Sequence, residues 1–244
     1  MKAMIFAAGL GTRLKPLTDT RPKALVEING QTLLQRLMLK IRQAGIRQVV
    51  VNVHHFPDMI INYLQANSGF GLEWAVSDER EQLLETGGGL RKAQPLLDGN
   101  EPILIHNVDI LSNLDFTRLI AAHRPDSLAT LVVSQRDTQR YFLFNHDLRL
   151  QGWTNIATGQ VRPNDINPDR FKHLAFSGIQ VISPQIFKHM NSFGEKFSIT
   201  DLYIQQCGTQ TIKGYVPHDY LMMDVGKISQ IQEAQSFAKR LEAD

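Results

Sequence analysis

The first 135 residues alternate between short apolar runs and longer stretches with helical periodicity. The apolar runs predict strands over residues 2–8, 46–53, 72–77, 102–110 and 127–134. The stretches between them predict helices over residues 32–45, 57–67, 88–97 and 115–123. Strands that alternate with helices imply right-handed βαβ units and a mostly parallel sheet. Because such sheets bind ligands beyond the carboxyl ends of their strands, we expect functional residues in the loops that follow the strands.

The pattern changes after residue 135. Residues 140–153 predict a hairpin that turns at Asn145-His146-Asp147, and the polar stretch 154–170 predicts a long loop. Residues 175–183 then predict a strand and residues 228–244 a helix. No internal repeat, low-complexity segment or linker interrupts the chain, so we expect one domain.

The composition excludes several classes of protein. With 43% hydrophobic and 20% charged residues, the chain can bury a sizeable core. A net charge of +2 is too small to indicate a nucleic-acid partner. The apolar runs are shorter than the roughly 18 residues of a membrane helix, so we expect a cytoplasmic protein with no membrane partner. The single cysteine, Cys207, excludes an intrachain disulfide and a cysteine metal cluster, and we expect it to pack at a helix end.

Two glycines and two basic residues follow the first predicted strand. Gly9 and Gly11 let backbone N–H groups approach an anion, and Arg13 and Lys23 offer positive charge nearby. The loop is not a P-loop, and Leu14 stands where a dinucleotide fingerprint has its third glycine. Taken alone, the pattern fits either an anion-binding loop or a flexible turn with a basic surface.

Several motifs in order make the pattern specific. "AAGLGTRLKPLTDTRPKAL" is followed by "LLETGGGLRKA", "NVDI", "FSGIQVI" and "MMDVGK". Together they resemble the sugar-1-phosphate nucleotidylyltransferases over nearly the whole chain, and most of all the short bacterial N-acetylmuramate-1-phosphate uridylyltransferases. That resemblance implies an α/β fold: a Rossmann-like, mixed but mostly parallel sheet flanked by helices, without a C-terminal β-helix. It also implies a nucleotide-binding half, 1–135, an acceptor-binding and metal-completing half, 136–244, and a role in peptidoglycan recycling.

The resemblance assigns roles to individual residues. Arg13 would hold the outer phosphates of a nucleoside triphosphate, and Lys23 would sit near the α-phosphate and the acceptor phosphate; these are the expected catalytic residues. The expected nucleotide-binding residues are Ala8, Gly9, Leu10, Gly11, Thr12, Arg13, Glu85, Thr86, Gly87, Gly88 and Asn107. The expected acceptor-binding residues are Lys23, Arg140, Ser177 and Gly178, of which Arg140 has no motif match.

Two aspartates suit a magnesium ion. Asp109 ends an apolar strand, Asp224 follows another β-like run, and the resemblance implies that they hold Mg²⁺ together. The surroundings depart from the family: Val108 replaces the usual glycine, and Met223 and Lys227 replace residues that are more often aromatic and threonine.

The implied reaction transfers a nucleotidyl group from a nucleoside triphosphate to a sugar 1-phosphate. UTP with N-acetylmuramate 1-phosphate is the leading pair. Another hexose or heptose 1-phosphate, a phosphocholine-type cytidylyl transfer, and a non-catalytic nucleotide-binding module stay open. The stretch "LQGWTNIATG" lacks the Glu-Lys-Pro motif with which many relatives contact the sugar. The sequence leaves the base, the acceptor and the oligomeric state undetermined.

Overall fold

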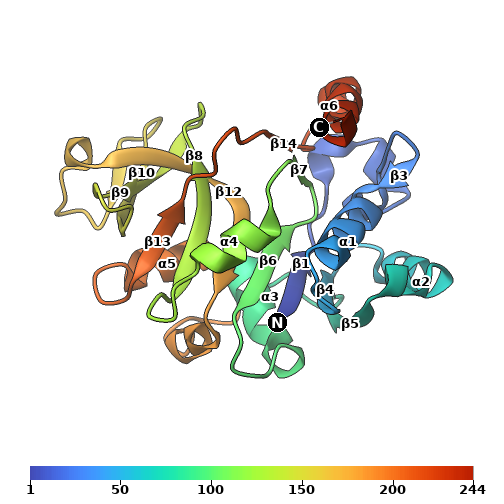
Figure 1. Cartoon of the computed structure of the whole chain (residues 1–244), viewed down its shortest axis with the longest axis horizontal. Helices are drawn as coiled ribbons and strands as arrows, with labels where there is room; N and C mark the ends of the chain where they lie inside the picture. The colour runs from blue at the N-terminus through green and yellow to red at the C-terminus, as the bar shows by residue number, and fades with distance from the viewer. Residues whose placement is uncertain (244) are drawn as a thin grey trace.

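A ten-stranded mixed sheet runs through the molecule, and helices cover both of its faces (Figure 1). The computed structural model describes residues 1–243. The strands of the sheet are β1 (Lys2–Phe6), β4 (Gln48–Val53), β5 (Glu73–Asp78), β6 (Ile103–Asn107), β8 (Ala129–Ser134), β9 (Arg140–Phe144), β10 (Leu150–Asn155), β11 (Gln160–Arg162), β12 (Lys172–Ile182) and β13 (Ile212–Tyr215). Two small sheets pair β2 (Glu27–Ile28) with β3 (Gln31–Thr32), and β7 (Ile110–Ser112) with β14 (Met222–Asp224).

The strand order joins a parallel side to an antiparallel side. On the parallel side, β5, β4, β1 and β6 lie next to one another and run in the same direction. On the other side, β12 runs antiparallel to β6 along one edge and to β8 and β9 along the other. Strands β10 and β11 continue from β9 in antiparallel pairs, and β13 pairs with β8 in parallel. The expected mixed sheet is confirmed. Strand β12 lies between β6 and β8, which follow each other in the predicted alternation of strands and helices.

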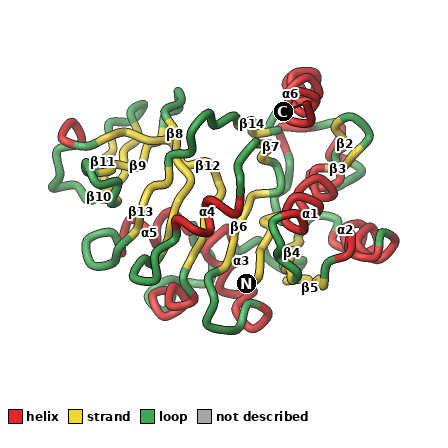
Figure 2. The backbone as a smooth tube through the Cα atoms, viewed as in Figure 1, coloured by secondary structure: helices red, strands yellow, loops and turns green. Residues whose placement is uncertain are grey.

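The α-helices of residues 1–243 are divided between the two faces of the sheet (Figure 2). They are α1 (Leu33–Gln43), α2 (Pro57–Ala66), α3 (Glu85–Ala93), α4 (Phe116–Ala122), α5 (Ile199–Gln206) and α6 (Ile231–Ala243). Side chains from α1, α2, α4 and α6 share one hydrophobic core, and those from α3 and α5 share the other. Strand β1 contributes Ala3 and Ile5 to the first core and Met4 to the second, so it is buried on both faces as the sequence predicts.

Local sequence signals explain where helices begin and end. Thr32 caps α1 by accepting a hydrogen bond from the Gln35 backbone, and Gly45 follows the helix with a φ of 81°. Pro57 opens α2, as expected. Asp115 caps α4, and Cys207 is buried at the end of α5, which confirms its packing role.

The prediction of one long loop over residues 154–170 is wrong. Strand β10 continues to Asn155, and β11 pairs with it before a short 3₁₀ turn at Pro168–Arg170. None of the three side chains of β11 is buried, so β11 needs no apolar pattern. Its pairing satisfies backbone groups that β10 would otherwise expose at an edge. The predicted β9–β10 hairpin is confirmed.

The C-terminal helix begins at Ile231, after a 3₁₀ turn at Ile228–Gln230. Asp244, the last residue of the predicted helix, lies outside the described residues. Within residues 1–243, no helix combines the length and apolar character that crossing a bilayer requires.

Candidate active site

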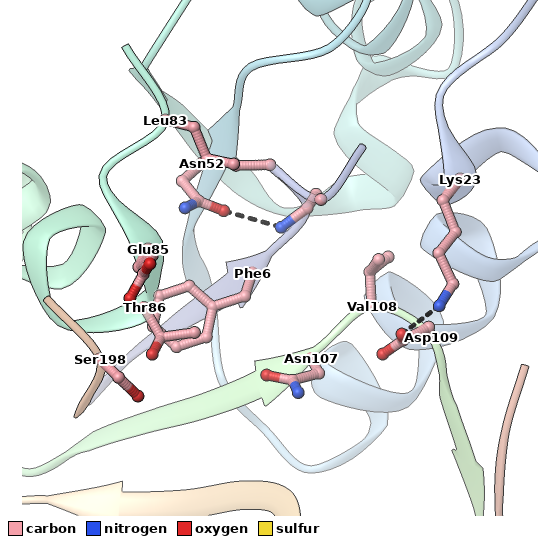
Figure 3. A pocket seen from close by; sticks show the side chains of 13 residues that line it. Phe6, Lys23, Asn52, Leu83, Glu85, Thr86, Asn107, Val108, Asp109 and Ser198 are labelled. Atoms are coloured by element: carbon pink, nitrogen blue, oxygen red, sulfur yellow. Dashed lines mark hydrogen bonds and ion pairs between the residues drawn. The ribbon is translucent and has the colours of Figure 1, made fainter. Parts of the chain in front are cut away.

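Two neighbouring cavities open where β1, β4 and β6 end. The first, of about 370 Å³, is lined by the opening loop, the ends of β4 and β6, and the start of α3 (Figure 3). The second, of about 260 Å³, lies toward β12 and the start of α5. Both cavities have Phe6, Thr86, Asn107 and Ser198 in their walls, so they form one continuous site. We refer to them as the nucleotide cavity and the acceptor cavity, after the substrates that the sequence resemblance predicts for their residues.

Asp109 and Asp224 lie together because β7 pairs with β14. Asp224 is opposite Ile110 in this small sheet, and the Val225 backbone donates a hydrogen bond to the Asp109 carbonyl at 2.9 Å. Lys23 joins the pair: its Nζ donates to Asp109 Oδ2 and lies 3.7 Å from Asp224 Oδ1. The structure thus brings together three residues that are far apart in the sequence.

The electrostatics of this cluster favour a cation. Burial and repulsion from Asp109 raise the pKa of Asp224, whereas Lys23 and Arg13 act to lower it. Two adjacent carboxylates offer oxygen ligands, which Mg²⁺ prefers, and leave its other positions to water and phosphate. Residues 1–243 contain no group of three or more His, Cys, Asp or Glu side chains suited to a metal. That Asp109 and Asp224 hold such an ion stays a prediction, which their position side by side supports.

The opening loop presents backbone donors to the same place. Gly11 has a φ of 65°, and its carbonyl accepts hydrogen bonds from the Leu14 backbone and the Thr18 hydroxyl, both at 2.8 Å. Among the described residues, the N–H groups of residues 8–12 donate to no protein acceptor. Such a run of N–H groups suits an anion.

Arg13 reaches the carboxylates from this loop. A Cβ added to Gly226 would lie 3.3 Å from Arg13 Nη2 and 3.1 Å from Asp224 Oδ1, so the guanidinium lies beside the second aspartate. Leu10 and Thr12 are exposed on the loop, and Ala8 and Gly9 line the nucleotide cavity.

The second glycine motif has a packing role. The N–H groups of Gly87 and Gly88 donate to the Phe197 carbonyl at 2.9 and 3.1 Å. A Cβ on Gly87 would lie 2.3 Å from the Phe197 ring, so a side chain would push α3 away from the segment before α5. Glu85 and Thr86, just before these glycines, line the nucleotide cavity. Contact between a base and Gly87 or Gly88 stays a prediction.

Sequence reasoning missed a buried link beneath the nucleotide cavity. Glu79 is fully buried, which raises its pKa, and its two oxygens accept hydrogen bonds from Asn52 Nδ2 at 2.7 Å and the Leu84 backbone at 3.1 Å. Asn52 Oδ1 accepts from the Ala7 backbone at 2.7 Å (Figure 3). The link ties the opening loop to the loop that carries Glu85. Both polar residues lie at strand ends, which is the signal that could have identified them.

The acceptor cavity contains two of the residues expected there. Ser177 and Gly178 lie where the pairing of β12 with β8 shifts register, and Gly178 has a φ of 71°. A Cβ on Gly178 would lie 2.6 Å from Asn107 Nδ2, so only glycine allows this approach. The bulge therefore places β12 against the end of β6.

Arg140 is not brought to this site. It is exposed at the start of β9, opposite Asn155, and lines neither cavity. Residues 150–159 also line neither cavity, because they form β10 and its turn into β11. Arg136, which follows the end of β8, lines the acceptor cavity instead. Its position two residues after a predicted strand is the signal that the choice of Arg140 overlooked.

Comparison with known proteins gives the class of this site. The family model described as "Nucleotidyl transferase" matches residues 2–240, so the chain belongs to the nucleotidyl transferase family and is an enzyme of that class. It is 31% identical to an N-acetylmuramate alpha-1-phosphate uridylyltransferase of Neisseria meningitidis serogroup B, with 98% of each chain covered. It is 33% identical to a protein of the same name from Caulobacter vibrioides, over 92% of this chain and 91% of that one.

A solved structure supports the fold. HddC from Yersinia pseudotuberculosis, complexed with GMP-PN, superposes with a TM-score of 0.77 at 22% identity and covers 96% of this chain and 98% of its own. At that identity the likeness concerns the fold alone, and it confirms the architecture inferred from the sequence.

Proposed function

We propose that this nucleotidyl transferase joins UTP to N-acetylmuramate 1-phosphate, within the broader sugar-1-phosphate nucleotidyltransferase activity of its relatives. The observation that carries the proposal is that one charged cluster spans two contiguous cavities: Lys23 and Asp109 line the nucleotide cavity, and Asp224, which Lys23 contacts, lines the acceptor cavity. Each cavity can hold one of the two substrates, and the charged cluster lies where the phosphates of the two substrates would meet. The two relatives at 31% and 33% identity, both matched over more than nine-tenths of their length, support this pair of substrates.

The nucleotide cavity suits a nucleoside triphosphate. The base would lie between Ala8 and Gly9 on one wall and Glu85 and Thr86 on the other. The triphosphate would follow the N–H groups of residues 8–12, and Arg13 would hold its outer phosphates as a planar, charged donor. The choice of UTP rests on the two relatives, both of which are uridylyltransferases.

The chemistry requires positioning rather than a covalent intermediate. An oxygen of the acceptor phosphate attacks the α-phosphorus in line, a new phosphorus–oxygen bond forms, and the bond to the bridging oxygen breaks. Pyrophosphate leaves with that electron pair, and no proton need move because the acceptor phosphate is already ionised. Lys23 would orient the attacking phosphate and balance the developing charge. Mg²⁺ held by Asp109 and Asp224 would neutralise charge on the triphosphate.

Each half of the chain supplies one of the two aspartates. Asp109 belongs to the nucleotide-binding half, 1–135, and Asp224 to the acceptor-binding half, 136–244, so neither half has both carboxylates. One sheet extends through both halves, which supports a single nucleotidyltransferase domain. Nucleoside triphosphates are cytoplasmic metabolites, which supports that location and, with this acceptor, a role in peptidoglycan recycling.

A grid of substrates tests the proposal. Pyrophosphate release is measured with each of four nucleoside triphosphates against N-acetylmuramate 1-phosphate, glucose 1-phosphate, mannose 1-phosphate and phosphocholine. We expect release that depends on Mg²⁺ and is fastest with UTP and the muramate phosphate. Faster turnover with another pair would keep the enzyme class and replace the substrates, and no release with any pair would contradict the proposal.

A further inference from the structure

Arg136 has no function in the reaction described above. It follows β8 at the wall of the acceptor cavity, and its Nη2 donates a hydrogen bond to the Phe176 carbonyl at 2.9 Å. The guanidinium forms no ion pair with any residue between 1 and 243. An arginine carries five N–H donors, so most of those on Arg136 remain available to a ligand.

The positive charge of Arg136 acts within this cavity. Arg136 lines the acceptor cavity together with Asp224, and the two side chains are not in ion-pair contact. The phosphates of both substrates have their own cations in Arg13 and Lys23, which lie at the carboxylate cluster. A further arginine, on the wall that would face the sugar, therefore indicates a second anionic group on the acceptor.

The rest of the wall is suited to a sugar. Ser198, Thr200 and Gln180 line the acceptor cavity and can bond to hydroxyl or amide groups, and the Phe176 ring offers an apolar surface. None of these side chains carries charge. An anionic substituent on the sugar would therefore be recognised by Arg136, whose planar fork matches a carboxylate in two parallel hydrogen bonds.

We infer that Arg136 binds a carboxylate on the acceptor sugar and that this enzyme selects sugar 1-phosphates with an acidic substituent. The inference deepens the proposed function, on which it rests: N-acetylmuramate carries a lactyl ether that ends in a carboxylate, whereas N-acetylglucosamine has a hydroxyl at the same carbon. Arg136 is thus a specificity-determining residue, separate from the residues that contact the transferred phosphate.

Two acceptors that differ in this group test the inference. We would compare kcat/KM for N-acetylmuramate 1-phosphate and N-acetylglucosamine 1-phosphate in the wild type, Arg136→Gln and Arg136→Lys. Arg136→Gln should lower kcat/KM for the muramate phosphate by about 10- to 100-fold, mostly through KM, because a charge-assisted hydrogen-bond pair is lost. Values for the glucosamine phosphate and the KM for nucleotide should change by less than about threefold, and Arg136→Lys should restore only part of the loss.

Matched variants separate recognition from general damage. Arg170→Gln removes another exposed arginine from the antiparallel side of the sheet, outside both cavities, and should behave as the wild type. Equal losses with both acceptors in Arg136→Gln, or no loss with either, would overturn the inference. It would also fail if Arg140→Gln, rather than Arg136→Gln, removed the preference for the carboxylate.

The experiment distinguishes failure of the proposed function from failure of the inference. If the wild type does not use N-acetylmuramate 1-phosphate, the same variants are compared with glucuronate 1-phosphate and glucose 1-phosphate. A preference for the glucuronate that depends on Arg136 would support the inference with a different substrate. No such preference would overturn it.

Discussion

The nucleotide cavity and the acceptor cavity are built in different ways. The nucleotide cavity lies at the ends of the parallel strands β1, β4 and β6. Much of its wall comes from two short stretches of sequence, the opening loop and the start of α3. The acceptor cavity combines a bulge in β12, the segment after β8 and the start of α5. Sequence motifs therefore predict the nucleotide cavity. The acceptor cavity forms only when distant segments of the chain pack together, so no single motif predicts it.

The difference has a chemical origin. Phosphates are bound by backbone N–H groups and cations, which a glycine-containing loop and a few basic residues supply in one stretch of chain. A sugar is recognised by single side chains at particular positions, and these can come from any segment that reaches the cavity. We therefore expect substitutions at the junction to affect both substrates, and substitutions away from it to affect one substrate or only stability.

Replacing Lys23 should have the largest effect. Lys23→Ala removes the cation that contacts both Asp109 and Asp224, so turnover should fall by about 10²- to 10³-fold or more. Initial rates of pyrophosphate release measure this loss with both substrates saturating. The exposed Lys188→Ala variant is the control, and thermal unfolding checks that both variants fold. Near-normal turnover in folded Lys23→Ala protein would contradict the role of this residue in the reaction.

The carboxylates should come next. Chelation of divalent metal should abolish turnover, and added Mg²⁺ should restore it. Asp109→Asn and Asp224→Asn should each lower turnover by roughly 10²-fold, because a neutral amide balances less cation charge. Calorimetric titration with Mn²⁺ in the presence of nucleotide should show weaker binding in both variants, whereas the exposed Asp126→Asn should match the wild type. Unchanged Mn²⁺ affinity in either variant would remove that aspartate from the metal site.

The Glu79 link should affect the nucleotide side alone. Both oxygens of Glu79 accept hydrogen bonds, one from Asn52 and one from the Leu84 backbone. Glutamine has only one accepting oxygen, so in Glu79→Gln its NH₂ group faces one of these two donors and that hydrogen bond is lost. We expect the free energy of unfolding to fall by about 1–3 kcal/mol and the KM for nucleotide to rise roughly tenfold, with the acceptor KM nearly unchanged. The exposed Glu81→Gln is the matched control. Equal increases in both KM values would indicate general damage rather than a role in positioning the nucleotide loops.

Lys40 should have the smallest effect on turnover, because it lies on α1, outside both cavities. Burial lowers its pKa to about 8, its Nζ donates to the Ser112 carbonyl at 2.5 Å, and it lies 5.0 Å from the centre of the Phe116 ring. Below pH 8 the ammonium is charged in both the folded and the unfolded chain, and burying it opposes folding. Between pH 8 and 10.5 only the folded chain releases this proton, so stability should rise with pH.

Urea unfolding at pH 7.5 and pH 10 measures this contribution. The shift in the pKa of Lys40 corresponds to a rise in the free energy of unfolding of roughly 2 kcal/mol between pH 7.5 and pH 10, relative to Lys40→Met. Lys40→Met has no titrating group at this position but keeps every other one. The difference between the two pH profiles therefore isolates the contribution of Lys40. Parallel pH profiles for the two proteins would contradict the prediction.

Much of the fold could be read from the sequence. The apolar runs and helical stripes predict the strands and helices of the first half. The N-cap residues Thr32 and Asp115, and Pro57 as a first helical residue, stand where their helices start. The strand within the stretch 154–170 could not be predicted, because β11 has only three residues and none of them is buried. Its pairing with β10 depends on the neighbouring strand rather than on its own pattern.

The sequence by itself determined which segments end strands and carry charge, including Arg13, Lys23, Asp109 and Asp224. Hydrophobic periodicity and glycine positions are local properties, so they can be identified in the sequence without knowledge of the fold. Only the tertiary structure decided that Lys23 lies between the two aspartates, that Glu79 links two loops through Asn52, and that Arg136 rather than Arg140 lines the acceptor cavity. Those relations depend on strand order and on how far a bulge displaces the backbone, because contacts between distant segments are set by the packing of the whole sheet.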